Sequence, residues 1–151
     1  MSRCTLKMTR EPCWSTLMGA RCIWVATAMP ACGCRMGGHV EPGEHPLATA
    51  EREAAEELQI DADFGVVGPR PLFLTVTTTI GRTAGHVDVS LWYVVRGDGA
   101  RNYDLDTTEF DGGRWWGIDP YGLPESDPHL GRFLRKLDAA LHSADVVRLD
   151  G

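Results

Sequence analysis

Three glutamates in one short acidic segment have a spacing suited to binding a divalent cation. Glu53, Glu56 and Glu57 stand at positions i, i+3 and i+4, so on a helix their side chains project from nearly one side. Carboxylates this close repel one another unless a cation lies between them, and Mg²⁺ takes oxygen ligands while retaining waters and substrate phosphates. Arg52 and Glu44 flank the cluster and can fix a loop against the helix by a charge-assisted contact. Taken alone, however, the three glutamates favour a simple solvated acidic face.

The residues around the cluster predict a loop followed by a helix. Residues 37–44 read Gly-Gly-His-Val-Glu-Pro-Gly-Glu, which is typical of a turn-rich loop. Pro46 suits the first turn of a helix, and residues 46–58 place apolar side chains on one face at Leu47, Ala50, Ala54 and Leu58. That apolar face can dock on a sheet, which would leave the glutamates on the other side.

Further along the chain, the apolar pattern predicts strands and then a second helix. Residues 71–80, 87–95 and 113–118 are rich in β-branched and aromatic residues, and Gly97-Asp98-Gly99 ends the second of these strands. The C-terminal segment 130–142 is amphipathic at helical spacing, with Leu130, Phe133, Leu134, Leu137 and Leu141 on one face. The order of these elements predicts an α+β or α/β sandwich.

The acidic segment also carries a longer pattern of glycine and charged residues. It reads Gly38-x5-Glu44-x7-Arg52-Glu53-Ala54-x-Glu56-Glu57-x-Gln59-Ile60. This resembles the Nudix box, Gly-x5-Glu-x7-Arg-Glu-U-x-Glu-Glu-x-Gly-U, where U is aliphatic. One position departs, because Gln59 stands where the family has a glycine that ends the helix with φ > 0. We expect Gln59 to cost up to about 1 kcal/mol of local strain.

The resemblance implies a fold, a reaction and a cofactor. The fold would be an α/β/α sandwich around a mixed sheet with a loop–helix–loop catalytic motif. The activity would be Mg²⁺-dependent or Mn²⁺-dependent hydrolysis of a diphosphate bond in a nucleoside diphosphate linked to another moiety. Bound metal ions would neutralise the phosphate oxygens and align an attacking water. The substrate stays open among oxidised nucleoside triphosphates, ADP-ribose, dinucleoside polyphosphates and nucleotide sugars.

The resemblance also assigns roles to particular residues. It implies that Glu53, Glu56 and Glu57 bind the metal, joined by the carbonyl of Gly37 or Gly38. Glu53 would also help to deprotonate the attacking water, and Glu44 and Arg52 would be supporting residues of the catalytic site. Members of the family often use one more acid outside the box, for which Glu109 is the candidate, with Asp88 and Asp111 as alternatives.

Aromatic residues on the predicted strands are candidates for stacking on a base. Trp92 and Trp115 are the two we assign to substrate binding, with Tyr93, Tyr103 and Trp116 as further candidates, although most strand aromatics belong to a core. His86 is interpreted as a structural residue of the sheet rather than a catalytic one.

Composition limits the classes of partner. The 151 residues fit one domain, and no apolar run approaches the length of a membrane helix, nor does the N-terminus resemble a secretory signal, so we expect a cytoplasmic protein without a membrane partner. The net charge of −6 argues against a nucleic acid polymer, but a bound metal would permit a small nucleotide substrate. A homodimer stays open.

The first 36 residues differ from the rest. They hold all five cysteines, all five methionines and five Lys/Arg against one acid, whereas residues 37–151 hold ten Lys/Arg against twenty acids. We divide the chain into an anomalous segment, 1–36, and a Nudix hydrolase domain, 37–151. The family has a segment like Trp-x-Leu-Pro before the two glycines, and an offset reading of the codons permits Trp-Leu-Pro-x-Gly-Gly in that register. Our hypothesis is therefore a frameshifted N-terminus with weak, irregular or poorly packed structure up to about Arg35. The encoding DNA is the direct test of that hypothesis.

Two other classes of function remain open. A Nudix-fold binding or regulatory module without turnover would explain an intact box behind an abnormal N-terminus. A zinc-binding structural protein would need the N-terminal cysteines, but none of them forms a CxxC pair.

Overall fold

The computed structural model describes residues 2–10, 21–27, 38–78, 87–98, 103, 110–117 and 128–149. Side chains are described for residues 38–78, 87–98, 103 and 128–143, and elsewhere in these ranges only the backbone is considered. Within these ranges the chain forms β1 (Ser2–Arg10), β2 (Arg21–Thr27), α1 (Pro46–Leu58), β3 (Phe73–Thr78), β4 (Val87–Gly97), β5 (Phe110–Gly117) and α2 (Leu130–Leu149). Neither described helix has the length and apolar composition needed to cross a membrane.

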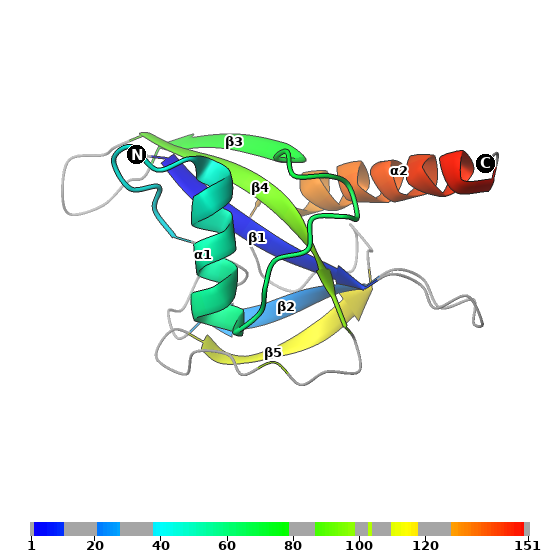
Figure 1. Cartoon of the computed structure of the whole chain (residues 1–151), viewed down its shortest axis with the longest axis horizontal. Helices are drawn as coiled ribbons and strands as arrows, with labels where there is room; N and C mark the ends of the chain where they lie inside the picture. The colour runs from blue at the N-terminus through cyan, green and yellow to red at the C-terminus, as the bar shows by residue number, and fades with distance from the viewer. Residues whose placement is uncertain are drawn as a thin grey trace.

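The strands form one mixed sheet in the order β3-β4-β1-β2-β5 (Figure 1). The central pair, β1 and β4, is parallel, whereas the other three neighbouring pairs are antiparallel. β1 runs in register with β4 from Ser2 beside Val89 to Arg10 beside Gly97.

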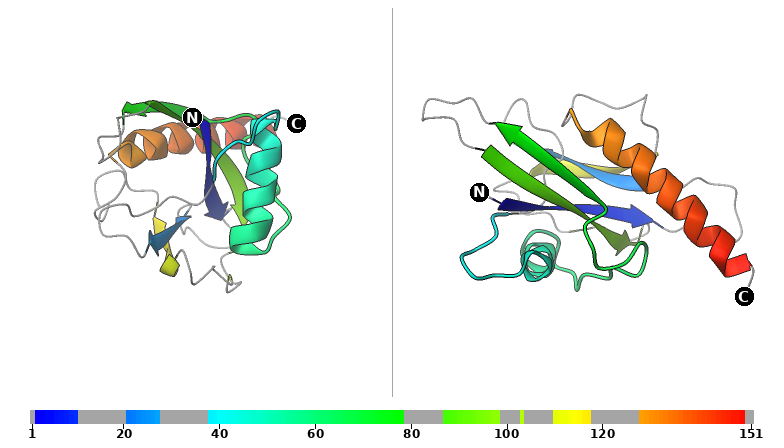
Figure 2. Two further views of the ribbon diagram at one scale, coloured as in Figure 1. Left: turned by 90° about the vertical axis from the view of Figure 1, so that its left-hand side faces the viewer. Right: turned by 90° about the horizontal axis from the view of Figure 1, so that it is seen from above.

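Helices cover both faces of this sheet (Figure 2). Side chains alternate along β4, so Tyr93 and Val95 pack against α1 while Trp92 and Val94 pack against α2. On the first face, Ala50, Ala54 and Leu58 of α1 are fully buried. The α/β/α sandwich that the resemblance implied is therefore confirmed.

Of the prediction of weak, irregular or poorly packed structure up to about Arg35, the irregular part is wrong for two segments, which form strands. Ser2–Arg10 lies at the centre of the sheet, and Arg21–Thr27 joins it to β5. Backbone hydrogen bonds between strands depend little on side-chain type, and neither segment contains glycine or proline. Well-packed strands in residues 1–36 would count against a frameshift, as the encoding DNA could, but the side chains of both strands lie outside the described residues, so the frameshift stays a prediction.

Candidate metal and catalytic site

A tight turn sets the start of the site. The carbonyl of Glu41 accepts a hydrogen bond from the Glu44 N–H at 3.0 Å, with Pro42 and Gly43 between them. Gly43 has a φ of 84°, and proline followed by glycine in these two places is typical of a type II turn. The turn brings the Glu44 carboxylate back over the loop, where its Oε2 accepts from the Glu41 N–H at 3.0 Å.

The helix α1 begins and ends for local reasons. His45 lies before it in an extended conformation and its Nδ1 accepts from the Leu47 N–H at 3.1 Å, while Pro46 occupies the first turn. Gln59 ends the helix in the left-handed region, with φ 53° and ψ 46°. The sequence prediction that Gln59 would take the strained conformation of the family's glycine is confirmed.

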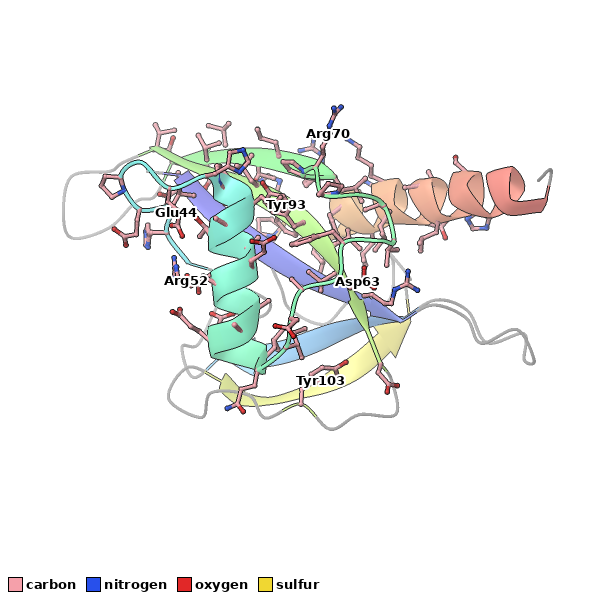
Figure 3. The ribbon with its side chains drawn as sticks, viewed as in Figure 1. Glu44, Arg52, Asp63, Arg70, Tyr93 and Tyr103 are labelled. Atoms are coloured by element: carbon pink, nitrogen blue, oxygen red, sulfur yellow. The ribbon has the colours of Figure 1, made fainter. Side chains whose placement is uncertain are left out.

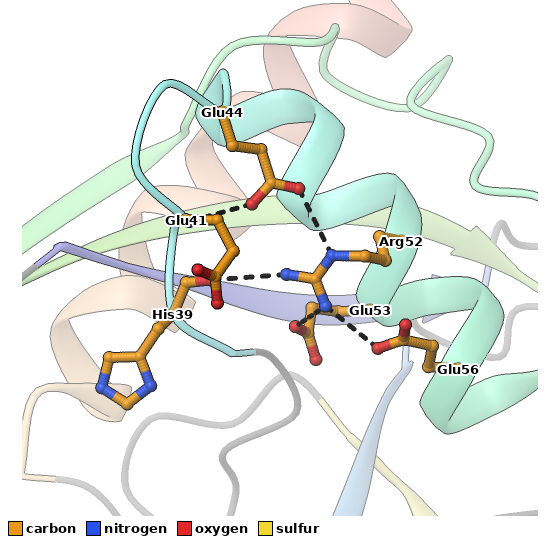
Figure 4. A network of polar contacts seen from close by, with 6 residues as sticks. All are labelled: His39, Glu41, Glu44, Arg52, Glu53 and Glu56. Carbon is orange, nitrogen blue, oxygen red and sulfur yellow. Dashed lines mark hydrogen bonds and ion pairs between the residues drawn. The ribbon is translucent and has the colours of Figure 1, made fainter.

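Arg52 is the hub of polar contacts at the site (Figure 4). Its Nε donates to Glu44 Oε1 at 3.3 Å, and its Nη2 donates to the His39 carbonyl at 3.3 Å. Its Nη1 donates both to Glu53 Oε1 at 2.6 Å and to Glu56 Oε2 at 3.0 Å. One guanidinium thus joins the loop to two of the three glutamates. The contact between Arg52 and Glu44, which fixes the loop against the helix, is the one that the sequence predicted.

These contacts shift the acidity of both partners. The pKa of Glu44 falls to about 2, chiefly because the Glu41 N–H donates to its carboxylate and then because Arg52 does. The hydrogen bond to Glu44 also raises the pKa of Arg52. Both groups are therefore charged throughout the range in which proteins are stable, and the loop stays attached to α1 by an ion pair. Figure 3 shows Glu44 and Arg52 together on one side of α1, away from Asp63 on the loop that follows the helix.

Glu53 lies against the backbone of the loop. Its side chain is close enough to Gly38 that a Cβ on Gly38 would overlap with Glu53 Oε1 and lie 2.6 Å from Cδ. Glu53 and Glu57 are 7% and 6% exposed, whereas the side chain of Glu56 is 59% exposed. A glycine at position 38 therefore gives Glu53 the room to reach the loop.

The three glutamates lie on one helix but do not converge at a single point. Among the residues whose side chains the structure describes, no three His, Cys, Asp or Glu side chains are arranged to hold a metal ion. Glu53 and Glu56 instead share the Nη1 of Arg52. The donor set nevertheless suits Mg²⁺ or Mn²⁺, because it consists of carboxylate oxygens, and two of the three carboxylates already lie around one cationic nitrogen.

The remaining predicted residues fall into two groups. Gly37, His86 and Glu109 lie outside the described residues, and so do the side chains of Asp111, Trp115 and Trp116. Asp88 is 2% exposed and shares the α2 face of β4 with Trp92, so it is not brought to the glutamates of α1.

The assignment of Trp92 to substrate stacking does not fit its position. Its side chain is 1% exposed, its ring packs 5.1 Å from that of Phe133, and its Nε1 donates to Thr75 Oγ1 at 3.2 Å. A buried ring with its polar atom satisfied is a core residue.

The two described tyrosines among the further stacking candidates also have partners within the protein. Tyr93 is buried, and its ring contacts that of Phe64 on the α1 side of the sheet. The Tyr103 hydroxyl accepts a hydrogen bond from the Asp98 N–H at 2.6 Å.

Sequence reasoning missed one contact of the site and one contact outside it. The carbonyl of His39 holds Arg52, and a backbone acceptor leaves no signal in residue type. The ion pair of Arg96 with Asp63 at 2.8 Å, reinforced by a backbone bond from Arg96 N–H to the Asp63 carbonyl, ties the loop after α1 to the end of β4. Arg96 and Asp63 are 33 positions apart in the sequence, so no local pattern predicts that they pair.

Known structures with this fold come from several organisms. The chain superposes on a C. elegans Ap4A hydrolase in a binary complex with a TM-score of 0.68 and 19% identity, covering 94% of this chain and 98% of that one. It also superposes on the E. coli dihydroneopterin triphosphate pyrophosphohydrolase, with a TM-score of 0.65, 15% identity and coverage of 94% and 95%. The third is the NUDIX domain of Shewanella oneidensis NrtR, complexed with ADP ribose. It superposes with a TM-score of 0.60 and 14% identity, covering 93% of this chain and 88% of that one. These likenesses show the fold.

A search of curated proteins by sequence gave no match. The sequence profile of the NUDIX domain, in contrast, matches residues 15–137, which is well over half of the chain and includes part of the N-terminal segment. The profile, the acidic helix and the α/β/α sandwich agree, and the chain belongs to the NUDIX family of hydrolases, which act on phosphoanhydride bonds.

Proposed function

We propose that this chain catalyses the Mg²⁺-dependent or Mn²⁺-dependent hydrolysis of a diphosphate bond in a nucleoside diphosphate linked to another moiety. The observation that carries the proposal is the placement of Glu53, Glu56 and Glu57 on one helix, with Glu53 held between Arg52 and Gly38. Carboxylate oxygens on one helix are the ligands that Mg²⁺ and Mn²⁺ prefer, and the side chains of Glu53 and Glu57 are nearly buried, which favours a fixed arrangement of these oxygens.

The protein residues divide the work between binding and positioning. Glu53, Glu56 and Glu57 would hold the metal through their carboxylate oxygens, joined by a backbone carbonyl at Gly37 or Gly38. When bound, such a metal supplies charge neutralisation of the phosphates and a water of lowered pKa. Glu44 and Arg52 fix the loop over the helix, and Glu53 is the residue we assign to accept a proton from the attacking water. Glu109 is proposed as an additional acid.

The class of substrate is a phosphoanhydride attached to a nucleotide-like group. The named relatives act on Ap4A or dihydroneopterin triphosphate, or bind ADP ribose, which supports this class for the present chain. The products would be a nucleoside monophosphate with either a phosphorylated second moiety or pyrophosphate.

A product-resolved substrate panel tests the proposal. Oxidised nucleoside triphosphates, ADP-ribose, dinucleoside polyphosphates and nucleotide sugars would each be incubated with the chain in Mg²⁺, in Mn²⁺ and in EDTA, and the products separated by chromatography. We expect at least one class to yield a nucleoside monophosphate only when a divalent cation is present. A folded chain that binds one of these nucleotides but cleaves none at saturating Mg²⁺ would instead be a binding module.

A further inference from the structure

Arg52 makes two kinds of contact, one with each side of its guanidinium. The Nε and Nη2 atoms hold groups of the loop, namely the Glu44 carboxylate and the His39 carbonyl. The Nη1 atom donates to Glu53 and Glu56, which belong to the set that we assign to the metal. The loop contacts can persist while the Nη1 contacts change, because they use different nitrogens.

The two glutamate oxygens that accept from Arg52 Nη1 cannot bind a metal ion unless their contacts with Nη1 change. Glu53 Oε1 lies 2.6 Å from Nη1 and Glu56 Oε2 lies 3.0 Å from it, so a divalent cation that bound the same two oxygens would be in close contact with a second positive charge. The exposed side chain of Glu56 is free to turn toward solvent, whereas Glu53 is confined by Gly38. The link to Glu56 is therefore the one that most easily breaks.

We propose that Arg52 is an exchangeable counter-cation for this site: it neutralises Glu53 and Glu56 until a divalent metal takes over their oxygens, and it then remains attached through Glu44 and the His39 carbonyl. The proposal rests on the metal binding assigned above under the proposed function. It has two consequences. Arg52 limits the repulsion among the glutamates when no metal is bound, and it weakens metal binding because the metal must displace its contacts.

The test compares Arg52→Gln with Arg96→Gln, which removes another arginine paired with a carboxylate. The side chains of Arg52 and Arg96 are 36% and 35% exposed, so the two substitutions are matched in burial, but Arg96 pairs with Asp63 away from the glutamates. The affinity for Mn²⁺ would be measured from the free Mn²⁺ signal in electron paramagnetic resonance. We expect R52Q to lower the Kd for Mn²⁺ by about five- to tenfold, the effect of removing one partly screened charge, and R96Q to leave it unchanged.

Thermal unfolding gives a second readout. In EDTA, R52Q should have a lower Tm than the wild type, and saturating Mn²⁺ should raise the Tm of R52Q by more than it raises that of the wild type. An Arg52 that only orients Glu53 for the metal would give the reverse: R52Q would bind Mn²⁺ more weakly and gain less from it. That result, or an unchanged Kd, would overturn the proposal.

A measurement on the wild type covers the case in which R52Q does not fold. The arginine side-chain signals would be followed by nitrogen-15 NMR during titration with Mg²⁺. We expect rotation of the Arg52 Nη1 group to become faster on addition of Mg²⁺ while the Nε–H signal stays protected by Glu44; no change in the Nη signals at saturating Mg²⁺ would refute the exchange. A chain that shows the Mn²⁺ and NMR pattern but cleaves no substrate would refute the proposed function alone. Mg²⁺-dependent turnover combined with weaker Mn²⁺ binding by R52Q would refute only the exchange.

Discussion

Replacing Gly38 by alanine should damage the site by moving a single carboxylate. The new Cβ would overlap with Glu53 Oε1 and lie 2.6 Å and 2.9 Å from Cδ and Oε2, well inside ordinary contact distances. Since α1 is packed on the sheet through fully buried Ala50 and Ala54, the helix cannot retreat, and the Glu53 carboxylate must shift by about 1 Å. Its 2.6 Å bond to Arg52 would then be lost.

The size of the effect follows from that displacement. Loss of a charge-assisted hydrogen bond at a nearly buried carboxylate costs about 1.5–3 kcal/mol, so the free energy of unfolding of G38A should fall by about 2 kcal/mol. A misplacement of about 1 Å at a catalytic group lowers turnover by roughly 100-fold. Urea denaturation and kcat on the substrate found in the panel measure the two quantities.

Gly68→Ala is the matched control. Gly68 has a φ of 93° and nothing within 4 Å of an added Cβ, so alanine there introduces backbone strain without a steric contact. We expect G68A to lose about 1–2 kcal/mol of stability and to keep its kcat, because Gly68 lies outside the site. If G38A kept wild-type kcat, or if both variants lost activity equally, the reasoning about Glu53 and Gly38 would be refuted.

Three further predictions concern single positions. Gln59→Gly should raise the free energy of unfolding by about 0.5–1 kcal/mol in chemical denaturation, because glycine relieves the left-handed strain at φ 53° but is more flexible in the unfolded chain; a loss of stability would contradict this. Asp63→Asn should cost at most about 1 kcal/mol at pH 7, since the half-exposed Asp63 pairs with Arg96. The hydrogen bond from the Gly65 N–H, and then the one from Arg96, lowers the folded pKa of Asp63 below its ordinary 3.8. The stabilisation by Asp63 is therefore present above pH 3.8 and is lost as pH falls through the folded pKa. The urea midpoints of wild type and D63N should approach each other below about pH 3.8, and a constant difference between them would exclude this linkage. Glu109→Ala should reduce turnover while the unfolding midpoint stays unchanged, and an unaltered rate at saturating Mg²⁺ would remove Glu109 from the site.

Local spacing was sufficient to predict the helix and its polar face. The bounds of α1, the turn before it and the left-handed Gln59 depend on residues a few positions apart, and the structure has each of them as predicted. The contact of Arg52 with Glu44 also lies within the box, across eight positions.

Features that depend on distant residues were predicted less well. Trp92 is on a strand as expected, but which face it occupies and what covers it depend on Phe133, far along the chain. The residues of β1 show no sustained alternation of apolar and polar side chains. The strand nevertheless lies between β2 and β4, whose backbones supply its hydrogen-bond partners in the sheet. The spacing predicted that the three glutamate side chains project from nearly one side of the helix, but it did not predict that Arg52 Nη1 donates to both Glu53 and Glu56.

The most direct test of a metal-dependent glutamate site compares Glu57→Gln with Glu51→Gln. Both residues lie on α1, but Glu57 is 6% exposed and belongs to the proposed metal site, whereas Glu51 is exposed to solvent. Turnover would be measured as a function of Mg²⁺ concentration, with unfolding midpoints as the check on folding. We predict that E57Q loses several orders of magnitude in kcat with little loss of stability, and that E51Q keeps near wild-type turnover. Near-full Mg²⁺-dependent activity in E57Q would contradict the assignment of this helix as the catalytic metal site.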